Sequence, residues 1–227
     1  MARESFARQL RGLQDEVIVL GSMVEKAIAR SVEALQKRDF ELADLVVKND
    51  EKINQKRFQI EEECVMLITK QQPMASDLRV ILSVLSVITD LERMGDYASG
   101  IAEITLILQH DPPLEPPAEF PRMAEIGIQM LSDSLKAFVA RDAEAAYRIG
   151  VRDDEIDALY HKVMQQCLAY ITEDPRTAAT ATRLIWVGHN LERIGDRVTN
   201  ICERVIFTVT GKMEEIWGTH PSAEASR

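Results

Sequence analysis

Hydrophobic residues recur every three or four positions over most of the chain, which is the spacing of one face of an α-helix. Between Glu4 and Arg38 this apolar stripe consists of Phe6, Leu10, Leu13, Val17, Leu20, Val24, Ile28, Val32 and Leu35. Asp39 interrupts the stripe and is a suitable N-cap, because its side chain can accept a hydrogen bond from the next helical turn. The pattern therefore predicts a first helix over 4–38 and a second that begins at Phe40.

The second helix is predicted to continue to about Lys70, because Pro73 cannot remain inside a helix. Ser76 or Asp77 is predicted to cap a third helix, which extends from about Leu78 to His110.

Five prolines lie between residues 111 and 121, so this segment is predicted to be an extended, stiff linker. The helical pattern then resumes. The three helices predicted in this half are Met123–Ala140, Ala143–Ile171 after a break at Asp142, and Ala178–Thr210 after Pro175. A short polar tail that contains Trp217 has no predicted structure.

The second half of the chain repeats the first, and a repeat of this length defines the fold. The motif Asp90-Leu-Glu-Arg-Met-Gly-Asp96 returns as Asn190-Leu-Glu-Arg-Ile-Gly-Asp196. At a constant offset, Asp50, Ile53, Asn54 and Cys64 correspond to Asp153, Ile156, Asp157 and Cys167. Short connections between helices favour antiparallel neighbours. We therefore expect an all-α protein of two tandem three-helix bundles related by pseudo-twofold symmetry, with bundles over 1–110 and 122–212, a linker over 111–121 and a tail over 213–227.

Composition narrows the class of protein. Hydrophobic residues make up 46% of the chain but aromatic residues only 5%, which suits packed helices better than strands. The net charge is −10 and no cluster of lysine and arginine is present, which argues against nucleic acid as a partner. No apolar run reaches the roughly 18–20 residues of a spanning helix, and no signal peptide is visible. We expect a cytoplasmic protein that is peripheral to the membrane at most, with its three cysteines buried rather than paired.

The repeated motif carries the candidate chemistry. Glu92 and Asp96 lie four residues apart on one helix face, where like charges repel. Gly95 adds a helix penalty of about 1 kcal/mol relative to alanine. The same unfavourable combination recurs at Glu192 and Asp196. A costly pattern that occurs twice in register indicates a function, although a single such pair is usually a solvated helix face.

Further polar side chains lie on the two middle helices, Asp50 with Asn54 on one and Asp153 with Asp157 on the other. Oxygen ligands suit Mg²⁺, Ca²⁺, Mn²⁺ and iron, and a carboxylate-rich site also takes Zn²⁺. Carboxylates on neighbouring helices favour a site with more than one metal. The eight candidate metal ligands are Asp50, Asn54, Glu92, Asp96, Asp153, Asp157, Glu192 and Asp196.

The neighbours of these carboxylates admit simpler explanations. Arg93 and Arg193 are expected to form salt bridges, and the glycines of the motif serve either close helix packing or access to a metal. His161 is expected at the surface, and His189 is treated as incidental because Thr89 replaces it in the first repeat.

Catalysis has little support in the sequence. No nucleophile–histidine–aspartate arrangement, phosphate-binding glycine loop or HExxH motif is present. The di-iron oxidases require Glu-x-x-His, whereas Gly95 and Gly195 occupy the position three residues after the glutamate. The preferred hypothesis is a non-enzymatic binding protein. A metal-dependent hydrolase, a ferritin-like redox enzyme and a helical scaffold without metal remain as alternatives.

Over about residues 3 to 210 the chain resembles the PhoU family, accessory regulators of the bacterial phosphate-specific transport (Pst) system. The resemblance depends on the tandem repeat, on Leu-Glu-Arg-x-Gly-Asp at 91–96 and 191–196, and on the acidic motifs that begin at Asp50 and Asp153. It implies two three-helix bundles and multinuclear iron or zinc. The metal would be held by Glu92, Asp96, Glu192, Asp196, Asp153 and Asp157, with the family pattern weakened at Asn54.

The resemblance also implies a cytoplasmic, often dimeric protein at the inner face of the membrane. It would mediate between the Pst phosphate ABC transporter and the sensor histidine kinase PhoR, and would keep the phosphate-starvation response off when phosphate is plentiful.

Overall fold

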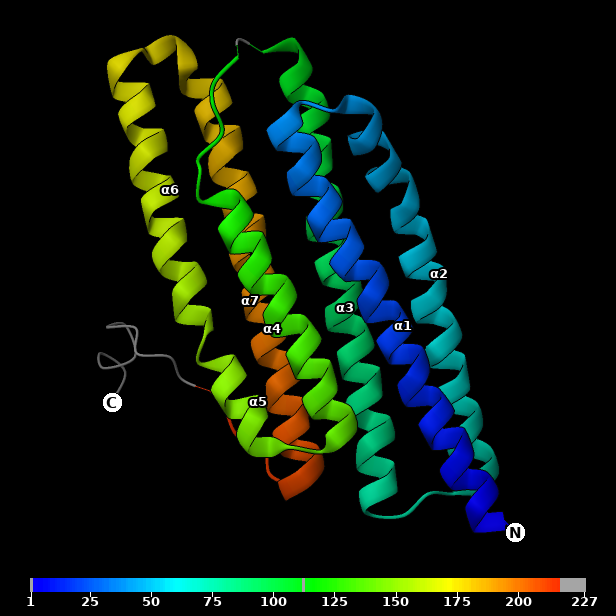
Figure 1. Ribbon diagram of the computed structural model, residues 1–227. Coiled ribbons are helices and arrows are strands. Elements are labelled where there is room, and N and C mark those ends of the chain that lie inside the picture. Colours follow the sequence, from blue (N-terminus) through cyan, green and yellow to red (C-terminus); the bar gives the residue numbers. More distant parts are fainter. Residues whose placement is uncertain (1, 112, 217–227) are drawn as a thin grey trace.

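The computed structural model describes residues 2–111 and 113–216, and within these residues it contains helices and no strands. The first repeat consists of α1 (Ala2–Lys37), α2 (Phe40–Gln71) and α3 (Ser76–Ile107), followed by a 3₁₀ turn η1 (Leu108–His110). The second repeat consists of α4 (Phe120–Ala140), α5 (Ala143–Gly150), α6 (Asp153–Glu173), the 3₁₀ turn η2 (Pro175–Thr177) and α7 (Ala178–Thr210). The predicted all-α fold of two tandem helical repeats is confirmed (Figure 1).

Both middle helices begin at an aspartate cap. Asp39 Oδ1 accepts a hydrogen bond of 2.9 Å from the backbone N–H of Leu42. Asp142 Oδ1 accepts an equivalent bond of 2.9 Å from Ala145. Each cap satisfies one of the N–H groups that have no partner at the start of a helix. The predicted breaks at these two positions are therefore correct.

Two helix starts differ from the prediction. Neither Ser76 nor Asp77 caps α3, because Ala75 occupies the N-cap position without a side-chain hydrogen bond. Helix α4 begins at Phe120 rather than at Met123. Pro121 is compatible with this start, since a proline in the first helical turn loses no intrahelical hydrogen bond.

The predicted single helix over 143–171 is wrong, because the chain turns at Val151 and Arg152 between α5 and α6. Ile216, which follows α7, contacts this break beside Gly150 and donates its backbone N–H to Glu203 Oε1 at 3.0 Å. The new helix opens with three acidic residues, which the positive end of the helix dipole favours. The described part of the predicted tail, residues 213–216, is thus anchored at Ile216, whereas Trp217 lies outside the described residues.

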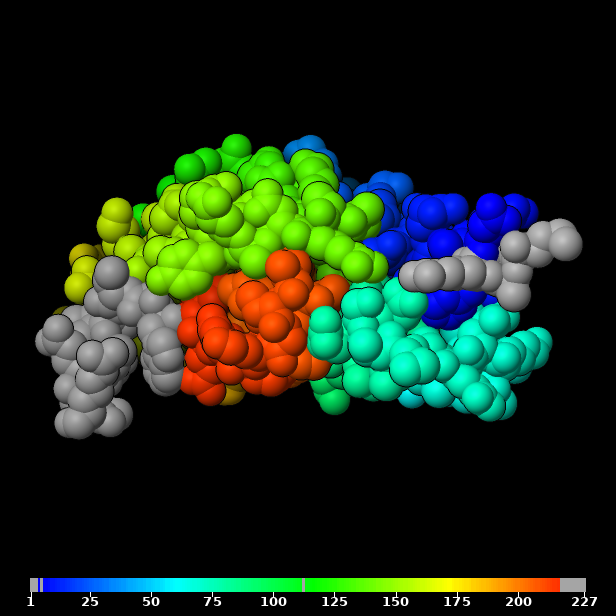
Figure 2. Space-filling view, turned by 90° about the horizontal axis from the view of Figure 1, so that it is seen from below, coloured from blue at the N-terminus to red at the C-terminus, as the bar shows by residue number. Residues whose placement is uncertain are grey.

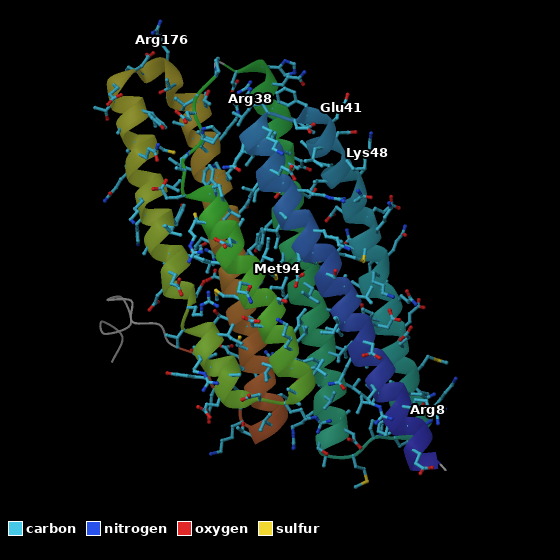
Figure 3. The ribbon with its side chains drawn as sticks, viewed as in Figure 1. Arg8, Arg38, Glu41, Lys48, Met94 and Arg176 are labelled. Carbon is cyan, nitrogen blue, oxygen red and sulfur yellow. The ribbon has the colours of Figure 1, made fainter. Side chains whose placement is uncertain are left out.

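Helices α3 and α7 run antiparallel at the centre of the molecule, with α1 and α2 beside one and α4 and α6 beside the other (Figure 1). Met94 of α3 lies in the interior, whereas the labelled charged side chains such as Lys48 and Arg176 point outward (Figure 3). The buried apolar side chains of both repeats form one continuous core. Within this core, α3 and α7 contribute Leu91, Met94, Ala98, Ile101, Leu191, Ile194, Val198 and Ile201, all nearly inaccessible to solvent.

The end view confirms this arrangement. Figure 2 shows the end of α7 between the turn that joins α4 to α5 and the segment that joins α2 to α3. The two repeats therefore share one interior and pack side by side along their length.

Three free cysteines, Cys64, Cys167 and Cys202, are buried as predicted. In the described chain, no helix combines the length and the apolar character that crossing a membrane requires.

A polar contact joins α3 to α7 across this core. Asp90 Oδ1 accepts hydrogen bonds from Arg197 Nη1 at 3.5 Å and from Asn200 Nδ2 at 3.3 Å. Burial is the main cause that raises the pKa of Asp90, and Asn200 and Arg197 oppose it. A buried polar group of this kind is costly unless its partners remain in place.

We expect Asp90→Ala to lower the free energy of unfolding by about 1–3 kcal/mol, because Arg197 and Asn200 would lose their shared acceptor. Urea unfolding measures this change. Thr89→Ala is the control: Thr89 is exposed and bonds only its own helix, so its effect should stay within about 0.5 kcal/mol. Equal losses in the two variants would contradict the prediction.

Candidate metal centre

The first cluster lies between α2 and α3. Burial raises the pKa of Asp50, and the carboxylates of Asp96 and Glu92 on the facing helix raise it further. Asn54 Nδ2 donates to Asp50 Oδ2 at 3.2 Å, which opposes the shift. The structure therefore brings together the four residues that the sequence proposed for the first repeat.

The second cluster lies between α6 and α7. Burial raises the pKa of Asp153 to about 8, with further contributions from Asp157, Asp196 and Glu192. Burial also raises the pKa of Glu192 to about 7, and Asp196 and Asp157 add to this effect. All four predicted carboxylates of the second repeat thus act on one another, which indicates a shared site of strong negative potential.

One oxygen in the first cluster and two in the second are buried and accept no hydrogen bond: Asp50 Oδ1, Asp153 Oδ1 and Glu192 Oε2. Buried carboxylate oxygens without a partner carry a large desolvation cost. A bound cation would satisfy such oxygens and would offset the repulsion between carboxylates. The donor set, which is made almost entirely of carboxylates, fits divalent metal ions.

The motif glycines allow the paired helices to approach closely. A Cβ atom on Gly95 would lie 3.3 Å from Asp50 Oδ1 and 3.2 Å from Ile53. A Cβ atom on Gly195 would overlap Asp153 Oδ1 and would lie 3.0 Å from Ile156. The glycines therefore serve close packing, and this packing places an aspartate of the middle helix against the carboxylate helix.

Arginine side chains pair with both carboxylates of each motif, as the sequence analysis expected. Arg93 lies 3.2 Å from Asp96 and 3.6 Å from Glu92. Arg193 lies 2.8 Å from Asp196 and 3.5 Å from Glu192. Among residues 2–111 and 113–216, no three acidic, histidine or cysteine side chains are already arranged around a common metal position. Metal binding would therefore require the arginines to release at least part of these carboxylates.

His189 is the neighbour that the sequence analysis set aside as incidental. Its Nδ1 atom lies 3.6 Å from Glu192 Oε2, and its ring contacts Trp186 edge-on at a centroid distance of 5.4 Å. Burial is the main cause that lowers the pKa of His189, with Arg193 also contributing. The signal was present in the sequence, since residues three apart share a helix face.

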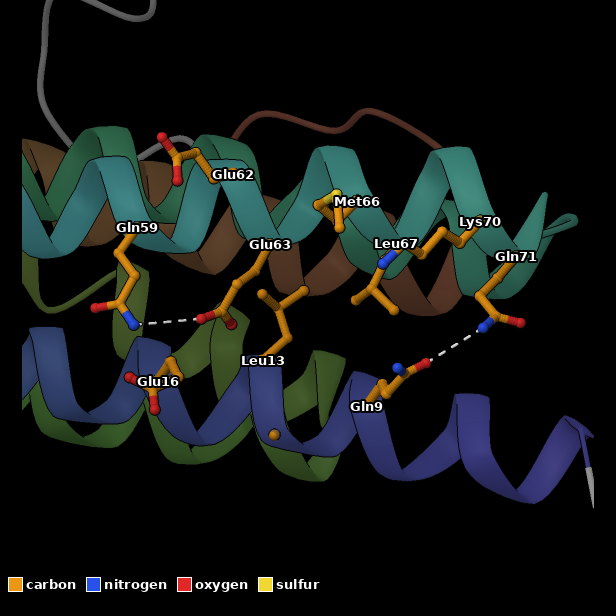
Figure 4. A pocket seen from close by; sticks show the side chains of 11 residues that line it. Gln9, Leu13, Glu16, Gln59, Glu62, Glu63, Met66, Leu67, Lys70 and Gln71 are labelled. Carbon is orange, nitrogen blue, oxygen red and sulfur yellow. Dashed lines mark hydrogen bonds between the residues drawn. The ribbon is translucent and has the colours of Figure 1, made fainter.

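A cavity of about 540 Å³ lies elsewhere, between α1 and α2. Figure 4 shows Gln9, Leu13 and Glu16 of α1 facing a row of α2 side chains that ends at Gln71. None of the eight candidate ligands lines this cavity. A smaller cavity of about 170 Å³ reaches Asp50 and Gly95 from the side of α1.

The buried carboxyls predict a pH dependence of the metal-free protein. Asp153 has a pKa of about 8 in the folded state and about 3.9 when unfolded. Its favourable contribution is complete below the unfolded pKa and is lost as the pH rises through the folded pKa. We expect the free energy of unfolding of EDTA-treated protein to fall between about pH 5 and pH 8, with Glu192 acting in the same direction.

Urea unfolding across this range measures the effect, and Asp153→Asn should flatten it. Asp44→Asn is the control, because Asp44 pairs with Lys48 on its own helix. Its free energy of unfolding should change with pH as that of the unchanged protein does. If the free energy of unfolding of Asp153→Asn fell with pH as steeply as that of the unchanged protein, the pH dependence could not be attributed to Asp153.

Gly195→Ala tests the close helix contact. The added methyl group would displace Asp153 and Ile156, and overpacking of this kind costs about 1–3 kcal/mol of unfolding free energy. Gly12→Ala is the matched control, because nothing lies within 4 Å of a Cβ atom at this helical position. That variant should gain about 0.5–1 kcal/mol. A stabilising effect of Gly195→Ala would show that the two helices are not held in contact there.

Solved structures with the same architecture include the crystal structure of PhoU from Pseudomonas aeruginosa. That structure is 35% identical and superimposes with a TM-score of 0.84 over 91% of this chain and 100% of its own. The crystal structure of the phosphate transport system regulatory protein PhoU from Streptococcus pneumoniae gives a TM-score of 0.86 at 31% identity, over 92% of this chain and 99% of its own.

Characterised sequences are similar over the same extent. The phosphate-specific transport system accessory protein PhoU homolog of Clostridium acetobutylicum is 37% identical over 95% of this chain and 99% of its own length. PhoU of Escherichia coli is 35% identical over 91% of this chain and 86% of its own length. The PhoU domain model matches twice, at residues 17–105 and 120–205. These two matches coincide with the two helical repeats, and the chain belongs to the PhoU family.

Proposed function

We propose that this chain is a metal-binding regulatory adaptor of phosphate uptake. It mediates between the Pst phosphate ABC transporter and the sensor histidine kinase PhoR, and represses the phosphate-starvation response when phosphate is plentiful. The names of its relatives support this proposal, since they are described as accessory or regulatory proteins of the phosphate-specific transport system. We further propose a cytoplasmic location and a homodimer.

The observation that supports metal binding is the presence, in both repeats, of buried carboxylate oxygens that accept no hydrogen bond from the described residues; only Glu192 Oε2 among them has a cation nearby, Arg193 Nε at 3.5 Å. Asp50, Asn54, Glu92 and Asp96 would hold metal in the first cluster. Asp153, Asp157, Glu192 and Asp196 would hold it in the second. Iron or zinc in multinuclear form would supply positive charge that neutralises the facing carboxylates. Each cluster would contribute ligands from two helices, so metal binding would stabilise the packing of α2 on α3 and of α6 on α7.

An adaptor is preferred to a carboxylate-bridged hydrolase or redox enzyme. An enzyme requires a substrate pocket beside the reactive group, whereas the cavity of about 540 Å³ is lined by neither cluster and the one that reaches Asp50 has only about 170 Å³. The relatives' names also describe accessory proteins rather than enzymes.

Metal content tests the proposal directly. Protein purified without added metal or a histidine tag should contain stoichiometric iron or zinc. Glu92→Gln/Glu192→Gln should lose it, because each substitution removes a carboxylate from one cluster. Glu125→Gln/Glu144→Gln is the control, as both side chains are well exposed, at 68% and 85%, and pair only with an arginine on their own helix.

The proposal that the protein binds metal would be overturned if neither the unchanged protein nor the variant contained metal and added metal did not raise the melting temperature. The proposed adaptor role is tested separately, by measuring binding of the purified chain to the transporter and to the kinase with and without metal. Failure to bind either partner would overturn the adaptor role.

A further inference from the structure

The two clusters are not equivalent, and the difference lies at His189. On the basis of the proposed metal function, we propose that His189 supplies an imidazole nitrogen to the metal in the second cluster. That cluster would then take a borderline transition metal such as Zn²⁺, whereas the first cluster holds its ion through oxygen ligands alone.

The geometry places His189 at the edge of the carboxylate group. It precedes Glu192 by three residues on α7, so both side chains lie on one helix face. Its Nδ1 atom is 3.6 Å from Glu192 Oε2, a buried oxygen that accepts no hydrogen bond and whose other charged neighbour is Arg193 Nε at 3.5 Å. The imidazole is only 30% exposed and Glu192 only 19%. A nitrogen ligand and a carboxylate oxygen are thus already adjacent, and an ion between them would contact both once Arg193 has released the carboxylate.

Surrounding side chains form a specific setting for the ring. Trp186 contacts it edge-on, and Tyr160 of α6 lies at a centroid distance of 6.3 Å. Tyr160 fits there because position 188 is a glycine: a Cβ atom at Gly188 would lie 3.0 Å from the tyrosine ring and 3.1 Å from Val163. The histidine ring therefore packs near one aromatic ring of its own helix, Trp186, and one of the neighbouring helix α6, Tyr160.

The first repeat lacks every part of this setting. The equivalents of Trp186, Gly188, His189 and Tyr160 are Ser86, Ile88, Thr89 and Arg57. Thr89 Oγ1 donates to Leu85 O at 2.9 Å and is engaged with its own helix. Arg57 pairs with Glu61 at 3.4 Å. The repeats thus differ at His189 and at the three residues around it, which supports a nitrogen ligand in the second cluster that the first cluster lacks.

The chemistry of the donors sets the expected preference. Imidazole suits zinc, copper, iron and nickel, whereas carboxylate and carbonyl oxygens suit magnesium, calcium and manganese. Adding one imidazole to the second cluster should therefore favour Zn²⁺ over Mn²⁺ there. In the first cluster Asn54 also replaces the carboxylate of Asp157, which leaves it with a lower charge and oxygen donors only.

Trp186 provides a reporter of the second cluster alone. The chain has two tryptophans, Trp186 and Trp217, so Trp217→Phe leaves a single emitter that contacts His189. In this background, metal-stripped full-length protein is titrated with Zn²⁺ and, separately, with Mn²⁺, while metal content is measured after dialysis. His189→Thr installs the residue of the first repeat. His110→Thr is the control, since His110 is exposed and lies in η1, outside both clusters.

The expected result is a Zn²⁺-dependent fluorescence change whose midpoint moves to roughly 10–100-fold higher Zn²⁺ in His189→Thr. The Mn²⁺ midpoint should change by less than about threefold, since Mn²⁺ prefers oxygen ligands. His110→Thr should match the unchanged protein in both titrations.

If His189→Thr binds Zn²⁺ as tightly as the unchanged protein, while Glu192→Gln abolishes binding, the assignment of His189 is overturned and the carboxylate site stands. An equal loss for Zn²⁺ and Mn²⁺ would also overturn it, because that result describes a structural role. If the unchanged protein binds neither ion, the metal function and this inference fail together.

Discussion

In each repeat an aspartate of the middle helix is pressed against a glycine of the last helix, and the candidate chemistry depends on this contact. Asp50 meets Gly95 and Asp153 meets Gly195. The contact is close enough to bury an aspartate oxygen, yet no donor from the protein reaches it. Packing and electrostatics therefore oppose each other: apolar burial draws the helices together, and the facing carboxylates repel. The arginine of the repeated motif pairs with the glutamate and the second aspartate of each cluster, and no donor reaches the buried oxygen of Asp50 or Asp153. A cation that reaches the inner oxygens would relieve the repulsion where it is largest.

The two clusters are connected through the central helices rather than isolated from each other. Asp90 lies two residues before Glu92 on α3, and its partners Arg197 and Asn200 follow Asp196 on α7. Each carboxylate pair is therefore on the same rigid helix as one side of the contact between the repeats.

The fold and most of the candidate site could be predicted because both leave periodic signals. Helix periodicity, the aspartate caps and the duplicated motif located the repeats and the eight polar residues that the structure brings together. The break between α5 and α6 was missed because the apolar pattern continues across it, and the residue that packs against it, Ile216, is more than sixty residues away in the chain. The significance of His189 was missed for a related reason. Comparing the repeats at that one position shows only a mismatch with Thr89. The role proposed for His189 becomes apparent only from the structure, in which Trp186 and Tyr160 lie near its imidazole ring and Gly188 leaves room for Tyr160.

The second cluster differs in electrostatics from the first in spite of the helix break, not because of it. Asp50 lies within a continuous helix, whereas Asp153 is the first residue of α6. A helix N-terminus favours a carboxylate by about 0.3–1 kcal/mol, which corresponds to less than about one pKa unit. Yet burial and the neighbouring carboxylates raise the pKa of Asp153 to about 8. The dipole is therefore outweighed, and the metal-free second cluster retains protons near neutral pH. A metal that binds there must displace protons as well as arginine, so its affinity should rise with pH. The first cluster has one carboxylate fewer, because Asn54 occupies the position of Asp157, so proton release should accompany metal binding there to a smaller extent.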